Sequence, residues 1–317
     1  MLGKLPSSES MSRLFKSYYS LKPLLPRRLQ LMLRRAHARN KLRTQGAIWP
    51  IDQKAAIPPK NWKGWPGGKQ FAFLITHDVD TAKGQENTRH MIELERELGF
   101  RGSYNFVPER YTVCEKLREY ITENGFEVGV HGLNHDGKYF NSRKIFLERS
   151  RKINQYIKEW NSHGFRTPSM HHKLDWLHSL DIKYDSSTFD TDPFEPQPDG
   201  VGTIFPFWVS SSDGYGGYIE MPYTLPQDFT LFVLLRQRNI EIWKRKLDWI
   251  AEKGGMALML THPDYINPYK KSIGDEEYPI RYISEFLSYV KKNYQGKYYH
   301  VLPRDLAKFW KENYVNN

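Results

Sequence analysis

Two carboxylates stand two positions apart at the end of an apolar stretch. In FAFLITHDVD, residues 71–80, Val79 separates Asp78 from Asp80. In an extended strand this spacing points both side chains to the same face. Carboxylates so close together raise each other's pKa unless a cation lies beside them. The spacing indicates either a solvated strand end or a site that holds a cation.

Two histidines four positions apart could supply further ligands for that cation. His131 and His135 lie in HGLNH, directly after another apolar stretch. One turn of helix would aim both imidazoles in the same direction, although such pairs also occur on solvated helices. Two imidazoles and one carboxylate, with one position left open, suit a catalytic zinc ion or another borderline divalent ion. We therefore expect one divalent metal ion, for which zinc fits best.

Three more reactive side chains end apolar stretches further along the chain. They are Arg166 in GFRTP, Asp185 in KYDSS and His262 in LMLTHP. Each also has an ordinary explanation, as a surface ion pair, a helix cap or a packed histidine. In a parallel α/β barrel, however, the carboxyl ends of the strands meet at one mouth, where active sites lie. Core packing does not explain charged groups at five strand ends.

The elements that would position these groups alternate along the chain. Largely apolar segments such as 71–78 and 256–263 predict strands, and amphipathic segments such as 87–99 and a long stretch within 141–160 predict helices. Repeated strand–helix units predict an α/β fold with a mainly parallel sheet, closed or nearly closed into a barrel. The Pro- and Gly-rich segment 57–70 marks its start. We therefore expect a basic, helical N-terminal extension over residues 1–56 and a (β/α) barrel domain over residues 57–317.

Five short motifs, THDVD, HGLNH, RTP, YDSS and LTHP, follow one another between residues 71 and 295. In this order they resemble the polysaccharide deacetylases of the NodB-homology type, carbohydrate esterase family 4. The resemblance implies a distorted (β/α) barrel and an enzyme that removes N-acetyl groups from amino sugars. The first motif departs from the usual adjacent aspartates followed by glycine. It is closer to a branch that includes peptidoglycan-deacetylase and allantoinase-like members.

The resemblance also implies roles for the reactive residues. Asp78 matches the general base, and Asp80 matches the carboxylate of the metal triad with His131 and His135, although the reverse assignment of the two aspartates stays open. Arg166 would hold Asp78 ionised, His262 would be the general acid, and Asp185 is the choice for orienting His262. Candidates for oxyanion or substrate binding are Ser169, through its backbone N–H, and the side chains of His171, His172 and Trp208.

Charge and cysteine content restrict the setting. The net charge is +11, and residues 1–46 hold eleven Lys and Arg against one Glu, so the remaining chain is almost neutral. A nucleic-acid-binding protein usually spreads positive charge over a folded face, so we expect no nucleic acid partner. A single cysteine, Cys114, excludes an internal disulfide and a cysteine metal cage. With no secretory signal or membrane span expected, the sequence favours a cytoplasmic enzyme of cell-surface polysaccharide biosynthesis.

The basic segment 21–43 has its own apolar stripe. Leu29, Met32, Leu33 and Ala36 recur at helical spacing, with arginines on the other faces. The helix could dock on the barrel with its arginines solvated, or it could lie on an anionic membrane surface, which would place the enzyme peripherally at the inner membrane. Both interpretations stay open.

Two alternatives to carbohydrate deacetylation also stay open. One is an amide hydrolase that acts on a small cyclic amide, as the allantoinase-like relatives do. The other is a non-catalytic protein that binds carbohydrate or an anionic surface with a degenerate site. The complete set of reactive residues favours catalysis over the second alternative.

Overall fold

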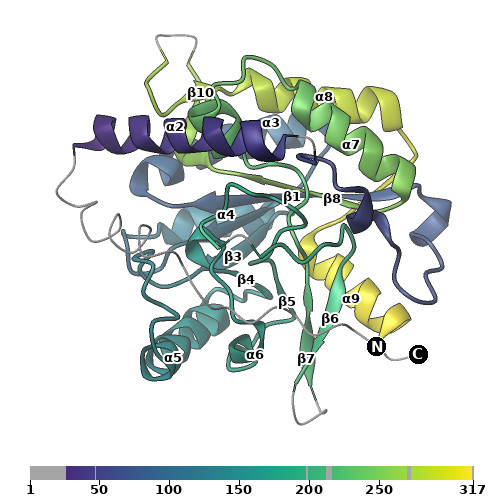
Figure 1. The fold of residues 1–317 in the computed structure, drawn as a ribbon. Helices are drawn as coiled ribbons and strands as arrows, with labels where there is room; N and C mark the ends of the chain where they lie inside the picture. Colours follow the sequence, from purple (N-terminus) through teal and green to yellow (C-terminus); the bar gives the residue numbers. More distant parts are fainter. Residues whose placement is uncertain (1–25, 47, 198, 212–215, 270–272, 316–317) are drawn as a thin grey trace.

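A curled, mainly parallel sheet wrapped by helices forms the body of the protein (Figure 1). This computed structural model describes residues 26–315 except 47, 198, 212–215 and 270–272. The first part of the predicted extension therefore lies outside the described residues. The curled sheet gives a half-barrel, which confirms the expected α/β fold.

Among the described residues the main sheet has nine strands, in the order β11-β1-β2-β3-β4-β5-β7-β6, with β8 also paired to β1. All are parallel except β6, which runs antiparallel to β7. The strands are β1 (Phe71–Val79), β2 (Ser103–Phe106), β3 (Glu127–His131), β4 (Gly164–Arg166), β5 (Tyr184–Asp185), β6 (Phe207–Ser210), β7 (Gly217–Glu220), β8 (Met256–Thr261) and β11 (Tyr298–His300). Strands β9 (Ile266–Asn267) and β10 (Tyr278–Pro279) form a separate pair.

Strand β1 lies at the centre of this arrangement. All nine of its residues are buried, and β8 pairs with it on one side while β11 and β2 pair with it on the other. A strand covered on both faces reads as a continuous apolar run, as FAFLIT does. Because β1 is held on both sides, the two aspartates at its carboxyl end have a rigid base.

Helices cover the outside of the sheet. The longer ones are α3 (Ala82–Leu98), α4 (Glu115–Glu123), α5 (Arg143–Glu159), α7 (Glu241–Lys253), α8 (Arg281–Tyr294) and α9 (Pro303–Tyr314). Short helical segments are η2 (Gln53–Ala56), η3 (Pro66–Gly68), η4 (Pro168–Met170), α6 (Leu174–Leu177), η5 (Phe229–Leu234) and η6 (Pro263–Tyr265). Helix α3 begins directly after Asp80, where Thr81 caps it by accepting a hydrogen bond from the Gly84 N–H. None of the described helices has the length and apolar content needed to cross a membrane.

The basic N-terminal segment contributes helix α2 (Arg27–Gln45), which packs on η5. Leu31 and Ala38 are buried against Phe229, Val233 and Leu234. The docked interpretation therefore holds for α2, but with a different face from the predicted stripe. Met32 and Leu33 of that stripe are 58% and 43% exposed. Met32 and Leu33 point outward because a different apolar pair, Leu31 and Ala38, faces the barrel.

The chain just before residue 57 also packs into the barrel. Trp49 and Ala55 belong to the same hydrophobic core as β1. The Ala55 carbonyl accepts a hydrogen bond from the Ile204 N–H at 3.0 Å. This stretch is therefore tied to the barrel by apolar contact and by backbone pairing.

Candidate active site

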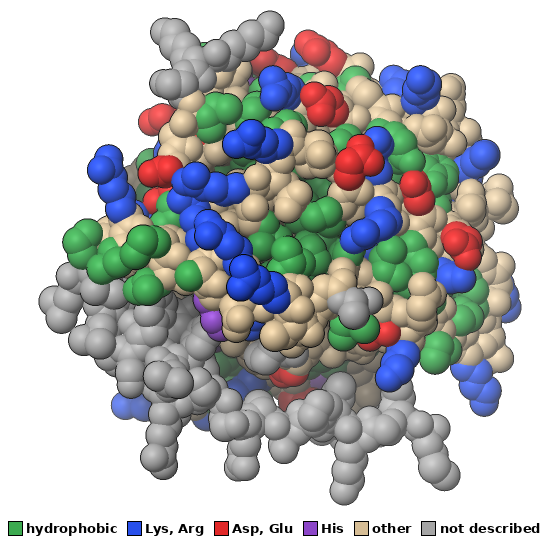
Figure 2. Space-filling model, turned by 45° about the horizontal axis from the view of Figure 1, so that its top comes forward, with side chains coloured by type: hydrophobic (Ala, Val, Ile, Leu, Met, Phe, Trp, Pro, Cys, Tyr) green, Lys and Arg blue, Asp and Glu red, His purple; other side chains and the backbone are tan. Residues whose placement is uncertain are grey.

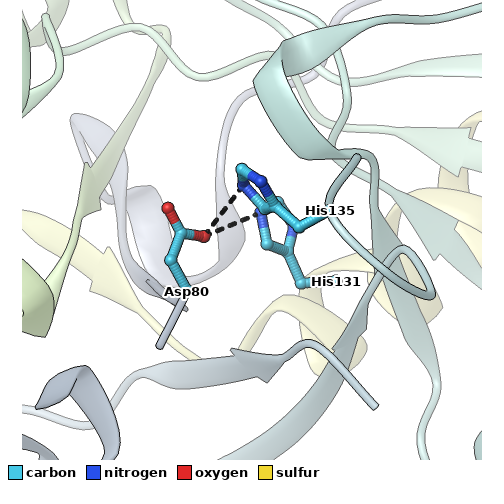
Figure 3. A group of neighbouring side chains, drawn as sticks. All are labelled: Asp80, His131 and His135. Atoms are coloured by element: carbon cyan, nitrogen blue, oxygen red, sulfur yellow. Dashed lines mark ion pairs between the residues drawn. The ribbon is translucent and has the colours of Figure 1, made fainter. Parts of the chain in front are cut away.

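Three possible metal ligands converge at the carboxyl ends of β1 and β3 (Figure 3). One ligand atom from each of Asp80, His131 and His135 lies within 4.8 Å of the other two. Asp80 Oδ1 is 3.4 Å from His131 Nε2 and 3.1 Å from His135 Nε2. That oxygen is buried and has no hydrogen-bond partner within the described part of the chain. A buried carboxylate oxygen facing two imidazole nitrogens is the donor set that a divalent ion such as zinc requires.

The backbone fixes how His131 is presented. Its Nδ1 lies 3.0 Å from the Arg166 carbonyl oxygen, to which it can only donate, so in the neutral imidazole the lone pair lies on Nε2, the nitrogen nearest Asp80. A second hydrogen bond of this kind usually orients a metal-binding histidine. The residues present therefore fit a metal ion.

A bend, not the predicted turn of helix, brings the two histidines together. Gly132 has φ 64° and His135 has φ 55°, both in the left-handed region. A Cβ on Gly132 would lie 2.5 Å from Pro168 Cδ. The spacing of four residues was thus the right signal, but the chain reverses through left-handed residues instead of continuing as a helix.

Asp78 lies beside this triad in an ion pair with Arg166. Its Oδ1 accepts hydrogen bonds from Arg166 Nη1 and Asn105 Nδ2, both at 3.0 Å, and Oδ2 is 3.6 Å from His131 Nε2. Burial raises the pKa of the Asp78 carboxyl, but the Arg166 guanidinium and His131 outweigh it, and the pKa lies below its ordinary value. Asp78 is therefore held ionised by Arg166 while Asp80 faces both histidines. Asn105, on β2, carries no motif that the sequence analysis could have used.

Ser186, which directly follows β5, holds the guanidinium of Arg166 on the side away from Asp78. Its Nη2 and Nε donate to Oγ and to the carbonyl oxygen of Ser186, both at 2.7 Å. The guanidinium is 1% exposed, so its orientation toward Asp78 is fixed by these bonds. The ion pair with Asp78 is the contact that the predicted role of Arg166 requires.

His262 is oriented by Asp228, not by Asp185 as predicted. His262 Nδ1 lies 2.7 Å from Asp228 Oδ1, and the backbone N–H of His262 donates to Asp228 Oδ2 at 2.8 Å. The Tyr278 hydroxyl also donates to Oδ2, at 2.7 Å. Burial alone would lower the pKa of His262, but the Asp228 carboxylate raises it to about 10. His262 therefore carries a proton at neutral pH.

Asp185 was assigned wrongly because β5 is far from β8 in the sheet order. Its carboxylate accepts hydrogen bonds from the Ser187 hydroxyl at 2.7 Å and the Ser187 N–H at 3.1 Å. The same hydroxyl accepts from the Thr167 N–H at 2.9 Å. Asp185 thus supports the Arg-Thr-Pro segment through Ser187. Asp228 belongs to none of the five sequence motifs, so its pairing with His262 becomes visible only in the folded chain.

The residues after Arg-Thr-Pro lie close to the histidine ligands. Ser169 is exposed and has φ 57°, in the left-handed region. His171 and His135 line the same small pocket, and burial lowers the pKa of His171. His172 points elsewhere, because its Nδ1 hydrogen-bonds with the Met170 carbonyl at 2.9 Å and its Nε2 is 3.6 Å from Asp199. Of the two histidines, His171 is the one beside a metal ligand.

Trp208 was predicted to contact substrate, and in the structure its ring packs against Lys311. It lies on β6, where the Lys311 ammonium of α9 is 5.5 Å from its ring centroid. The described residues show no contact between Trp208 and the metal ligands. A substrate contact of Trp208 stays a prediction; in the sheet, β6 is the last strand of the path while Asp80 follows the central β1.

Two groups that the sequence analysis missed support the end of β1. The Asp80 N–H donates to Asp264 Oδ2 at 2.9 Å, and the Tyr111 hydroxyl donates to the Val79 carbonyl. Burial raises the pKa of Asp264 to about 6. Tyr111 also lines a surface hollow of about 430 Å³ together with Arg110 and Trp160. The hollow therefore adjoins the strand that carries both aspartates.

Comparison with known proteins extends the fold assignment. No family model matches the chain, and no curated protein matches its sequence. Among solved structures, a Mycobacterium smegmatis protein named as a polysaccharide deacetylase superposes with TM-score 0.62 and 16% identity, covering 81% of this chain and 95% of its own. The allantoinase PuuE gives TM-score 0.60 and 14% identity, with coverages of 85% and 99%.

A third similar structure is a Pseudomonas aeruginosa PAO1 protein also named as a polysaccharide deacetylase. Its TM-score is 0.57 at 14% identity, covering 85% of this chain and 100% of its own. At these identities the likeness shows a common fold. The chain thus has the half-barrel fold expected from the NodB-type resemblance.

Proposed function

We propose that this protein is a metal-dependent hydrolase that removes N-acetyl groups from an amino-sugar substrate. One observation carries the proposal. An ionised carboxylate, Asp78, and a protonated imidazole, His262, both adjoin a complete set of metal ligands. Pairs of titratable groups whose pKa values are pushed apart mark the base and acid of a hydrolytic site. The fold shared with proteins named as polysaccharide deacetylases supports the same reaction.

Asp80, His131 and His135 would hold the metal ion, for which zinc is the best fit to two imidazoles and one carboxylate. When bound, a divalent ion polarises the acetyl oxygen and lowers the pKa of water. Asp78 then accepts the proton of the attacking water. Arg166 keeps Asp78 in place and ionised before that step, since it donates to Asp78 Oδ1.

His262 donates a proton to the departing amine. Its ion pair with Asp228 keeps the proton on the imidazole at neutral pH and fixes the ring through Nδ1. This leaves Nε2 to face the leaving group. The backbone N–H of Ser169 is our candidate for binding the oxygen that develops negative charge, and His171 is a candidate substrate contact beside His135.

We further propose a cytoplasmic enzyme whose substrate is an N-acetylated intermediate of cell-surface polysaccharide assembly. The single cysteine, Cys114, is free and exposed. A reducing compartment is compatible with such a thiol.

A second candidate reaction is hydrolysis of a small cyclic amide. The observation that favours it is the fold shared with the allantoinase PuuE. The same base, acid and metal ligands would serve both reactions, so the substrate distinguishes them.

Acetate release from a panel of N-acetylated sugars and sugar nucleotides, with allantoin as the cyclic amide, tests both candidates. Metal-loaded protein should release acetate from at least one sugar, and chelator should abolish the release. The Asp78→Asn variant is the matched control for contaminating activity. Turnover of allantoin without any acetate release would support the second candidate. Acetate release that survives both chelator and Asp78→Asn would overturn the proposal.

A further inference from the structure

Helix α2 carries two different faces. The inner face holds Leu31 and Ala38 and packs on η5. The face turned away from the barrel, which we call the outward face of α2, consists of Arg28, Met32, Leu33, Ala36, Arg39 and Arg43, all exposed. Figure 2 shows hydrophobic side chains beside a row of Lys and Arg side chains on the side of the molecule that includes the top of Figure 1.

The positive charge of the outward face is uncompensated. Helix α2 contains no Asp or Glu. Within the part of the chain that the structure describes, Arg28, Arg39 and Arg43 form no ion pair. By contrast Arg27 pairs with Glu276, and Arg35 donates to the Val233 carbonyl at 3.0 Å. The inner arginines are thus used to dock the helix, and the outer ones are left free.

Apolar side chains lie among these free arginines. Met32 is 58% exposed and lies on the same helical row as Arg28 and Arg39, and Leu33, which follows it, is 43% exposed. Met32 and Leu33 would contribute little to binding a nucleic acid backbone, whose phosphate groups offer no apolar surface. A bilayer interface takes both kinds of side chain, because apolar groups enter the acyl boundary while arginines contact lipid phosphates. We propose that the outward face of α2 binds the surface of an anionic phospholipid bilayer.

The docked side of α2 is connected to the candidate active site through aromatic contacts. The Arg34 guanidinium lies 4.5 Å from the Phe229 ring centroid, and Phe229 packs on Tyr265 at 4.7 Å. Tyr265 in turn is 5.4 Å from His262. Helix α2 would therefore lie between the bilayer and the wall of the site that carries the general acid. This inference does not rest on the proposed reaction, since the outward face contains no residue of the site.

Vesicle co-sedimentation of the full-length protein tests the proposal. Mixed phosphatidylcholine and phosphatidylglycerol vesicles should bind the protein, and pure phosphatidylcholine vesicles should not. Because only two large apolar side chains insert, binding should be reversible and should fall as salt screens the arginines.

The variant Arg28→Gln/Arg39→Gln/Arg43→Gln should weaken binding to the anionic vesicles by about 100-fold, since each interfacial arginine contributes about 1 kcal/mol. Met32→Ser/Leu33→Ser should weaken it by about 10-fold, as less apolar surface is buried. The matched control is Lys144→Gln/Arg151→Gln/Lys158→Gln on α5, which removes the same charge from exposed positions at the opposite end of the view in Figure 1. The control should bind like the unmodified protein.

Thermal unfolding and acetate release on a soluble substrate show whether each variant is folded. Equal binding of the α2 and α5 charge variants would overturn the proposal, because net charge alone would then drive binding. Equal binding to neutral and anionic vesicles would also overturn it. If the outward-face variants instead change the oligomeric state and no vesicle is bound, the face belongs to a contact with a second copy.

Discussion

At the residue scale, the site separates two aspartates that the sequence presents as a pair. Asp78 accepts hydrogen bonds from Arg166 and Asn105. Asp80 instead faces the two histidines, and its Oδ1 has no hydrogen-bond partner in the described chain. The spacing alone left the reverse assignment open. Their different partners support Asp78 as the base and Asp80 as the ligand.

The first prediction concerns this division. Asp78→Asn should keep the bound metal and lose about 10²–10⁴-fold in rate, because a positioned general base contributes that much. Asp80→Asn should lose the metal itself. Metal content of both purified variants, measured beside acetate release, checks the assignment. Metal loss in Asp78→Asn together with retention in Asp80→Asn would show that the two roles are reversed.

The second prediction concerns the pair formed by His262 and Asp228. The pKa of His262 is raised to about 10 from an ordinary value of 6.5, so its proton is available below pH 10. Asp228→Asn removes the carboxylate that causes the increase, and the alkaline limit of the rate should move to lower pH. The control is Asp185→Asn, which should leave that limit in place because Asp185 contacts Ser187. The same alkaline limit in Asp228→Asn and in the unmodified protein would contradict this prediction.

The same pair affects stability. Because the folded-state pKa of His262 lies above the ordinary value, the ion pair stabilises the fold fully below about pH 6.5, and this contribution disappears as the pH rises through about 10. Asp228→Asn should therefore lower the melting temperature at pH 6 more than at pH 10. An equal change at both pH values would indicate that the loss comes from packing and not from charge.

At the element scale, the sequence predicted the strands but not the loops between them. The buried run in β1 and the helical periodicity of α5 are local signals, and both elements lie where they were expected. The histidine pair was expected on a helical turn and lies on a bend, since a left-handed conformation at His135 has no signal in residue type. The partner of His262 was missed for a different reason, because Asp228 precedes it by 34 residues and is brought to it only by folding.

The third prediction tests this bend. Gly132 and Gly137 both have left-handed φ angles, 64° and 71°, but only a Cβ at Gly132 would meet Pro168. Gly137→Ala should cost about 1–2 kcal/mol of unfolding free energy for its φ angle. Gly132→Ala should cost about 1–3 kcal/mol more, because Pro168 must move, and should weaken metal binding. Denaturant unfolding of both variants makes the comparison. Equal losses would show that contact with Pro168 does not constrain the bend.

At the scale of the whole molecule, the described part of the basic extension packs on the barrel. Leu31 and Ala38 cover Phe229 and Val233, and Trp49 lies in the main core. The sequence predicted the positive charge of this segment, but it did not predict which face of α2 packs on the barrel. The predicted stripe of four apolar residues and the pair Leu31 and Ala38 lie on different faces of α2, and contact with η5 buries the pair.

The fourth prediction follows from this packing. A chain that starts at residue 57 should unfold at lower denaturant concentration than the full chain, because each large apolar side chain removed from the core costs about 1.5–3 kcal/mol. A chain that starts at residue 26 keeps these contacts and is the control. If the chain starting at residue 57 is as stable as the control, α2 and Trp49 contribute nothing to the fold.

Metal titration of the metal-free protein, with acetate release as the readout, tests the central claim most directly. The donor set of Asp80, His131 and His135 predicts that activity rises with added zinc and saturates at one equivalent per chain. The His131→Ala variant should stay inactive over the same range. Acetate release that is already complete without metal, or that rises equally in His131→Ala, would contradict the account.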